Sequence, residues 1–482
     1  MLIKQHFTYF PYCNRIFIFA FIAIILTVPT CLSAQSDTIR YESELSGLVS
    51  TGKYSPFWLQ SNRYGKISPS PISALLSGNI YKEFENSEKL IDYGFKISTL
   101  LQTDKSVTKL YFHEFYAKAR LSVYSMTVGS RERIFGNQDS TLSCGGFLFS
   151  KNARPMPEIS IDIERFTPVP LTYGFLEIKG GLRHGVFSDN ISIRGALLHH
   201  KYLYARIGGK LPVHFQYGID HAAQWGGTNP VYGAYPNGFK NYLRIFMAKS
   251  GSNDANESDR INVLGNHIIS QSMKVELDIS GIKLSGYWQN LSEDGPVKFI
   301  TGNPMNMPDG LWGISVKSNK YPFVKGLLYE LLNTTDQSGP YHDKDGLIYG
   351  GRDNYFLNGS YQSGWSFYSH TIGTPFITSP IYNNNGILCT TNNRVRVHHF
   401  GIEGNVSGFE YKALASFSRN YGTYSKPLDI RNTSVLLEIN KQVSWLSGLE
   451  LSCSAGGDFG KLYGNSLGLL FSVRKRGILF GY

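Results

Sequence analysis

Polar and apolar residues alternate along most of this chain. In "EISIDIE" (158–164) three isoleucines alternate with Ser160, Asp162 and Glu164, and "MKVELDIS" (273–280) repeats the pattern. Successive side chains of a β-strand point to opposite faces, so this alternation predicts strands with one apolar face. Beyond residue 28 no apolar run reaches the length of about 18 residues expected of a membrane-spanning helix. The chain is therefore expected to be all-β.

Two kinds of connection separate these strands. Apolar-Ser-Gly-apolar tetrapeptides stand at Ile279–Ile282, Val406–Phe409 and Leu446–Leu449, and "IGGKL" (207–211) resembles them. Glycine tolerates the positive φ that a two-residue hairpin turn requires. Long polar stretches lie between these turns, and they are Arg131 to Pro157, Asp220 to Ser270, Leu291 to Gly310 and Leu332 to Asn393. Short turns at one end and long loops at the other are typical of a transmembrane β-barrel.

The strand count supports a single barrel domain over 35–482. Eighteen strands fit between residues 41 and 475, an even number that places both termini and the Ser-Gly turns on the periplasmic side. Two strand-like segments, 241–248 and 364–373, must then belong to inserted loops 220–270 and 332–393, which are expected to occlude the pore. In "DHAAQWGG" (220–227) several polar side chains would be costly against lipid, which predicts a position in the lumen or the extracellular layer.

The first 34 residues have the pattern of a cleaved secretory signal peptide. Lys4 and Arg15 precede or border a 13-residue apolar core, "IFIFAFIAIILTV", and "LSAQ" follows with cleavage expected after Ala34. Removal of this segment leaves 45 basic and 36 acidic residues. A basic exported protein suits an acidic polysaccharide or the phosphates of lipopolysaccharide, although the charge also suits solubility and anchoring at the membrane edge. These features predict the outer membrane of a Gram-negative bacterium.

Cysteines and metal motifs restrict the chemistry. Cys144, Cys389 and Cys453 remain after cleavage, so one bridge at most can form, and Cys144–Cys389 is the candidate because both residues fall in loops. The sequence has no zinc-ligand spacing, and the adjacent histidine pairs would point to opposite faces of a strand. We therefore expect no metal or other cofactor, and no nucleic-acid partner.

Several loop segments together resemble the Wzi-type capsule assembly family. The stretches that carry this resemblance are "SPFWLQSNRYG" (55–65), "VGSRERIFG" (128–136), "LHHKYLYARIG" (198–208), "GIDHAAQWGG" (218–227), "INVLGNH" (261–267), "DQSGPYHDKDG" (336–346) and "GGRDNYFLNGSYQSGWSFYSHTIGTPF" (350–376). They cover most of the mature chain in the family's order. The resemblance implies an eighteen-stranded outer-membrane barrel with an occluded lumen that attaches or organises capsular polysaccharide at the cell surface.

Two clusters have the side chains that a sugar site requires. Sugar rings present apolar C–H faces and a rim of hydroxyl groups, so a flat aromatic ring next to amide, carboxylate or guanidinium groups suits them. The candidates are His221, Gln224, Trp225, Asn229, Tyr341, His342, Asp343, Arg352, Asp353, Asn354, Tyr355 and Trp365. Arg352 could bind a uronic carboxylate in a fork. The alternative is that these residues satisfy each other inside a plugged lumen.

Three functions remain open at this level. The first is a monomeric surface lectin without bond chemistry. The second is a diffusion channel, which the two long inserted loops disfavour. The third is a barrel esterase or hydrolase built from separated Ser, His and acidic residues, which no motif supports; "GNSLG" (464–468) lacks the strand–turn–helix context of a nucleophile elbow. A soluble array of β-sandwiches is the alternative fold.

Overall fold

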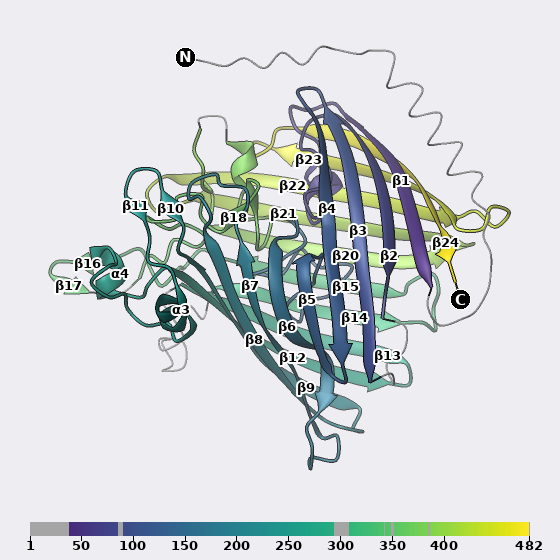
Figure 1. Ribbon diagram of the computed structural model, residues 1–482. Coiled ribbons are helices and arrows are strands. Elements are labelled where there is room, and N and C mark those ends of the chain that lie inside the picture. Colours follow the sequence, from purple (N-terminus) through teal and green to yellow (C-terminus); the bar gives the residue numbers. More distant parts are fainter. Residues whose placement is uncertain are drawn as a thin grey trace.

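The chain folds into one closed antiparallel β-barrel, seen in a computed structural model (Figure 1). The structure describes residues 38–84, 90–293, 308–341, 343–348, 351–383 and 386–481. The predicted signal peptide and His342 lie outside these residues. Within them, no helix combines the length and the apolar character that crossing a bilayer would require.

Eighteen strands form the barrel wall, as the alternation predicted. Each strand pairs antiparallel with the next along the chain, and β1 pairs with β24 to close the ring. The wall strands are β1 (Ile39–Ser50), β2 (Ile72–Lys82), β3 (Ile91–Asp104), β4 (Thr108–Leu121), β5 (Tyr124–Ser130), β6 (Pro157–Pro168), β7 (Leu176–Val186), β8 (Leu197–Ile207), β9 (Val213–Trp225), β12 (Asn266–Ile279), β13 (Ile282–Ser292), β14 (Gly310–Ser318), β15 (Gly326–Asn333), β20 (Val395–Val406), β21 (Phe409–Gly422), β22 (Pro427–Gln442), β23 (Leu449–Gly460) and β24 (Ser466–Phe480).

Short elements lie in the connections between these strands. They are α2 (Phe57–Gln60), β10 (Thr228–Asn229), β11 (Gly233–Ala234), α3 (Phe239–Phe246), α4 (Glu257–Ile261), β16 (Asp343–Lys344), β17 (Leu347–Ile348), β18 (Ser366–Phe367), β19 (His370–Thr371) and the 3-10 helix η2 (Pro380–Tyr382). The two strand-like segments that were expected to stay out of the wall do so. Residues 241–248 fall largely in α3, and residues 364–373 contain the small hairpin β18–β19.

Alternation along each strand separates a lipid-type face from an interior face. On β24, Leu467, Phe471 and Val473 are 57%, 54% and 40% exposed on the outside, whereas Leu470 is 3% exposed inside. Closure pairs every strand on both sides, so the wall offers no free edge of N–H and C=O groups. The sequence pattern and the closed ladder together produce a wall suited to a bilayer.

The short turns and the termini lie at the same end of the barrel. Ser280-Gly281 and Ser407-Gly408 form two-residue hairpin turns in which all four residues have positive φ. Ser447-Gly448 ends a longer connection, 443–448, in which Val443 donates to the Leu449 carbonyl. The odd–even order of the strands places all three turns on one side, as predicted.

Long connections at the opposite end, 51–71, 131–156 and 334–394, fill the barrel. The other predicted loop is observed at 226–265 and packs largely against the outer side of the wall. All four residues of α2 are buried, and Leu142, Cys144 and Phe376 pack in the same apolar cluster. The predicted Cys144–Cys389 bridge is wrong: both thiols are free, since Cys144 is buried in that cluster and Cys389 is not bonded to it.

This topology predicts a labelling pattern. In a background with Cys389→Ser and Cys453→Ser, the variants Ser280→Cys, Ser407→Cys and Ser447→Cys should resist a membrane-impermeant maleimide on intact cells and react after the outer membrane is permeabilised. Ser425→Cys, in the short β21–β22 connection at the other end, should react on intact cells. Surface labelling at any of the three turn positions would reverse the assigned orientation.

Candidate functional site

The two predicted loops meet at the outer end of the barrel, where β9 ends. Gln224, at the end of β9, donates through Nε2 to the Gly364 carbonyl at 3.1 Å. The Tyr361 hydroxyl donates to the Gly226 carbonyl at 3.2 Å. Loops 226–265 and 334–394 are therefore joined to each other and to the end of the wall.

Both predicted stacking tryptophans are buried, Trp365 inside the barrel and Trp225 on the outer side of the wall. Trp225 is 3% exposed and Trp365 is 1% exposed. Trp365 Nε1 donates to the Leu148 carbonyl at 2.9 Å, and its ring packs edge-on against Phe149 and Phe187. A sugar ring needs an open aromatic face, and neither residue has one, so their assignment as sugar plates is not supported by their burial.

Two polar neighbours of Trp225, His221 and Asn229, form hydrogen bonds within the protein. His221 and His267 share a hydrogen bond of 2.7 Å between their rings. Asn229 accepts the N–H groups of Val231 and Tyr232 at 2.8 and 3.1 Å and donates to the Tyr235 hydroxyl. Buried polar groups usually have such partners, and those of Asn229 organise the start of loop 226–265.

The location of "DHAAQWGG" differs from the prediction. Strand β9 continues to Trp225 instead of ending near residue 219. Asp220 and Gln224 face the interior, where Asp220 accepts from His200 at 3.0 Å. His221 and Trp225 alternate with them and face outward, where Tyr242 of α3 packs against Trp225. The stretch remains in the wall because loop 226–265 folds back over its outer side.

Apart from His342, the remaining predicted residues lie in the described parts of loop 334–394. Tyr341 is 49% exposed, and Lys344 Nζ lies 4.4 Å from its ring centroid. Arg352 is exposed and Asp353 and Asn354 are half-buried, whereas Tyr355 is fully buried. Arg352 and Asn354 have φ values of 62° and 46°, a conformation that non-glycine residues seldom adopt. The side chain of Asp343 is not described.

A buried carboxylate, Glu330, that the sequence analysis missed anchors loop 131–156. Glu330 on β15 is 0% exposed. Its Oε1 accepts the hydroxyls of Ser143 at 2.7 Å and Tyr287 at 2.5 Å, and its Oε2 accepts the Cys144 N–H at 2.7 Å. The only available sequence signal was that loop 131–157 is long and polar, because "YELLN" around Glu330 resembles any other strand.

A second buried carboxylate fixes the start of loop 334–394. Asp309 accepts the N–H groups of Asp336 at 3.0 Å and Gln337 at 2.8 Å, and the Asn333 amide at 3.0 Å. Burial raises the pKa of the Asp309 carboxyl to about 6. Burial of its charge at neutral pH is costly, and the three donors offset part of that cost.

The structure brings Ser416 and His399 together on neighbouring wall strands, an arrangement that can be compared with a hydrolase site. His399 Nδ1 lies 2.7 Å from Ser416 Oγ, but its Nε2 lies 2.8 Å from the Leu142 carbonyl rather than from a carboxylate. Trp58 Nε1 donates to the same Ser416 oxygen at 3.0 Å, and both members of the pair are buried. The pair therefore fastens α2 and loop 131–156 to the wall.

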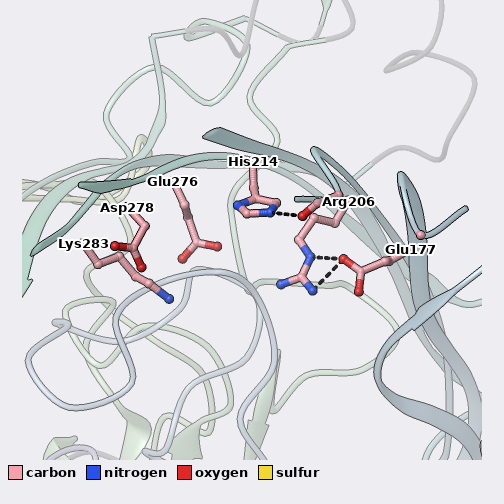
Figure 2. Close-up of a pocket in the computed structure, with 8 residues that line it drawn as sticks. Glu177, Arg206, His214, Glu276, Asp278 and Lys283 are labelled. Carbon is pink, nitrogen blue, oxygen red and sulfur yellow. Dashed lines mark hydrogen bonds and ion pairs between the residues drawn. The ribbon is translucent and has the colours of Figure 1, made fainter. Parts of the chain in front are cut away.

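A polar pocket lies at the end of the barrel that carries the short turns. It has a volume of about 200 Å³, and Figure 2 shows acidic and basic side chains facing one another across it. Arg206 and Glu177 are paired at 2.6 Å. The lining side chains labelled there are Glu177, Arg206, His214, Glu276, Asp278 and Lys283. This pocket therefore lies at the end of the barrel opposite the long loops.

Comparison with known proteins gives a family and a fold. The family model described as capsule assembly protein Wzi matches residues 76–377. Among solved structures, the Escherichia coli outer-membrane protein Wzi, described as involved in group 1 capsule assembly and as a carbohydrate-binding β-barrel, has a TM-score of 0.59 at 11% identity, covering 91% of this chain and 85% of that one. Pseudomonas aeruginosa OccK3 has a TM-score of 0.48 at 10% identity, covering 92% and 96%. No curated protein sequence matches this chain.

The contacts of Glu330 lead to a stability prediction. In Glu330→Gln the amide nitrogen cannot accept a hydrogen bond, so at least one buried donor among Ser143, Cys144 and Tyr287 loses its partner. Such a loss costs about 1–3 kcal/mol. Trypsin should then cleave after Lys151 or Arg154 in detergent faster than in the parent protein, while the barrel keeps its heat-dependent gel mobility.

Glu410→Gln is the matched control. The Glu410 side chain is 64% exposed and forms a long ion pair with Lys325 at 3.8 Å, so its replacement should leave the cleavage rate unchanged. Equal cleavage rates in Glu330→Gln and the parent would contradict the anchoring role of Glu330.

Proposed function

Because this chain belongs to the Wzi family of capsule assembly proteins, we propose that it holds capsular polysaccharide at the surface of the outer membrane. The closed barrel lies in that membrane with its long loops outward. Binding without bond chemistry is the activity that we propose, since the buried His399 of the Ser416–His399 pair has a backbone carbonyl rather than a carboxylate at its second ring nitrogen.

The observation that carries this proposal is the difference between the two predicted clusters. The residues around Trp225 are buried, whereas Tyr341, Lys344 and Arg352 are exposed on the loop that covers the outer end. A half-exposed tyrosine ring can pack against the C–H face of a sugar, and nearby cations can pair with carboxylates on the polymer. We propose that Tyr341, Lys344, Arg352, Asp353 and Asn354 form the polysaccharide contact, with His342 and Asp343 in the same segment.

The filled lumen supports holding over transport. Three connections, 51–71, 131–156 and 334–394, supply buried side chains to the apolar clusters inside the barrel. A diffusion channel requires a water-filled path through these segments, and a polymer requires a wider one. The channel reading is therefore the weaker alternative. A monomer is the expected state, since the closed ring leaves no edge strand for pairing between copies.

This proposal predicts a loss of capsule retention in Tyr341→Ala combined with Arg352→Ala. Each aromatic contact contributes about 0.5–1.5 kcal/mol beyond area burial. A repetitive polymer engages many copies at once, so a small loss per site is multiplied by avidity. Cell-associated capsule should fall and polymer shed into the medium should rise, as measured by uronic acid or immunoblot assay of both fractions.

Tyr173→Ala with Arg165→Ala removes the same two residue types at the opposite end of the barrel, where both are exposed. This control should retain capsule at the parental level. If the Tyr341 and Arg352 variant is folded, present at the surface and retains capsule like the control, the polysaccharide contact lies elsewhere.

A further inference from the structure

The outer face of the wall carries an unusual polar patch on β7, β8, β9 and β12. His184, His199, Ala223 and His267 are directly paired across these four strands and share one face. His199 is 0% exposed and His267 is 1% exposed. Farther along the same outer face of β8, Leu203 is 60% exposed. Uncovered imidazoles at the position of lipid-facing leucines would be costly, so something must cover them.

Helix α3 provides that cover from outside the barrel, as its position beside the wall in Figure 1 shows. The Tyr242 ring lies 5.6 Å from His184, 5.5 Å from His199 and 5.7 Å from Trp225, measured between ring centroids. Ile245 is buried in a cluster with Ala223 and Trp225. One face of α3, which carries Tyr242 and Ile245, therefore packs against the wall.

A second face of α3 is apolar and exposed. Phe239 and Leu243 of α3 and Met247, the residue directly after it, recur at four-residue intervals, which aligns them along one side of the helix. They are 75%, 48% and 58% exposed. Large apolar side chains in a row on an exposed helix mark a surface that meets another apolar phase.

This apolar face adjoins the lipid-facing belt of the wall. Phe246 packs against His199 at 5.5 Å, and Lys201 Nζ lies 3.9 Å from the Phe246 ring and donates to its carbonyl. The next outward residue of β8 is Leu203. The helix thus sits immediately beyond the belt, at the depth where acyl chains give way to headgroups.

The charge of the segment suits that depth. Residues 238–250 contain Lys240, Arg244 and Lys249 and no acidic residue. Lys240 and Lys249 are exposed, and Arg244 donates to the Ser250 carbonyl at 2.7 Å. A helix with an apolar stripe and basic flanks binds a bilayer surface that carries phosphate groups.

We propose that α3 is a membrane-surface anchor that embeds Phe239, Leu243 and Met247 among the acyl chains of the outer leaflet and pairs Lys240 and Lys249 with lipid phosphates. The anchor also seals the histidine patch from the bilayer. This role is separate from polysaccharide binding and rests on the position of the barrel in the outer membrane.

A depth measurement on the full chain tests this anchor. Leu243→Cys, in a Cys389→Ser and Cys453→Ser background, is labelled with the fluorophore NBD and reconstituted in vesicles of phosphatidylcholine and phosphatidylglycerol. Emission should shift to the blue and lose intensity when the acyl chains are brominated. Leu347→Cys, an exposed leucine on the β16–β17 hairpin, is the matched control and should keep its emission.

A second arm tests the phosphate contacts. Quenching at position 243 should increase with the phosphatidylglycerol fraction, and Lys240→Gln with Lys249→Gln should abolish this dependence. Water-like emission at position 243 in every lipid mixture would overturn the anchor. Quenching that does not change with the phosphatidylglycerol fraction would contradict the phosphate contacts. Cross-linking of α3 to another protein in native membranes, without quenching by lipid, would assign this face to a protein partner.

Discussion

The structure depends on one constraint: polar groups that the barrel removes from water must find partners within the chain. Closure of the wall gives the backbone N–H and C=O groups of the strands hydrogen-bond partners, since β1 pairs with β24. It also leaves interior carboxylates such as Glu330 and Asp309 without solvent. Loop N–H and hydroxyl groups supply their donors, and the donors position the loops. The same requirement acts outside, where α3 covers histidines that would otherwise meet lipid.

The parts of the fold that follow from local physics could be predicted from the sequence. Side-chain alternation has a period of two wherever one face meets lipid, so strands such as 158–164 and 273–280 are recognisable one at a time. The Ser-Gly turns fix the register of their hairpins, because Gly281 and Gly408 require positive φ. Because the strand number is even, the long loops could be assigned to one end of the barrel. Their polar residues would be costly against lipid, so the loops were expected to occlude the pore.

The parts that depend on tertiary contacts could not be predicted in this way. In the sequence, Trp225 and Trp365 suit aromatic rings on which a sugar could stack. The exposure of a ring depends on tertiary packing, however, and both rings are buried. The polar run after Ile219 appears to end β9, yet the strand continues because a covering helix lies 14 residues farther along the chain. Residues 241–248 suit a strand by composition, whereas their apolar spacing of four fits the helix that forms. Glu330 had no signal, since a single glutamate in an alternating strand normally faces water.

The central claim is that a barrel closed by its own loops binds surface polysaccharide through the exposed part of loop 334–394. The most direct measurement is equilibrium binding of the purified, folded protein in detergent to capsular polysaccharide isolated from the cells that produce it, immobilised on a sensor surface. The account predicts saturable binding by the intact protein. Replacement of residues 339–354 by a Gly-Ser linker should abolish this binding, while heat-dependent gel mobility shows that the barrel of the variant is still folded. Absence of binding by the intact protein, or equal binding after that replacement, would contradict it.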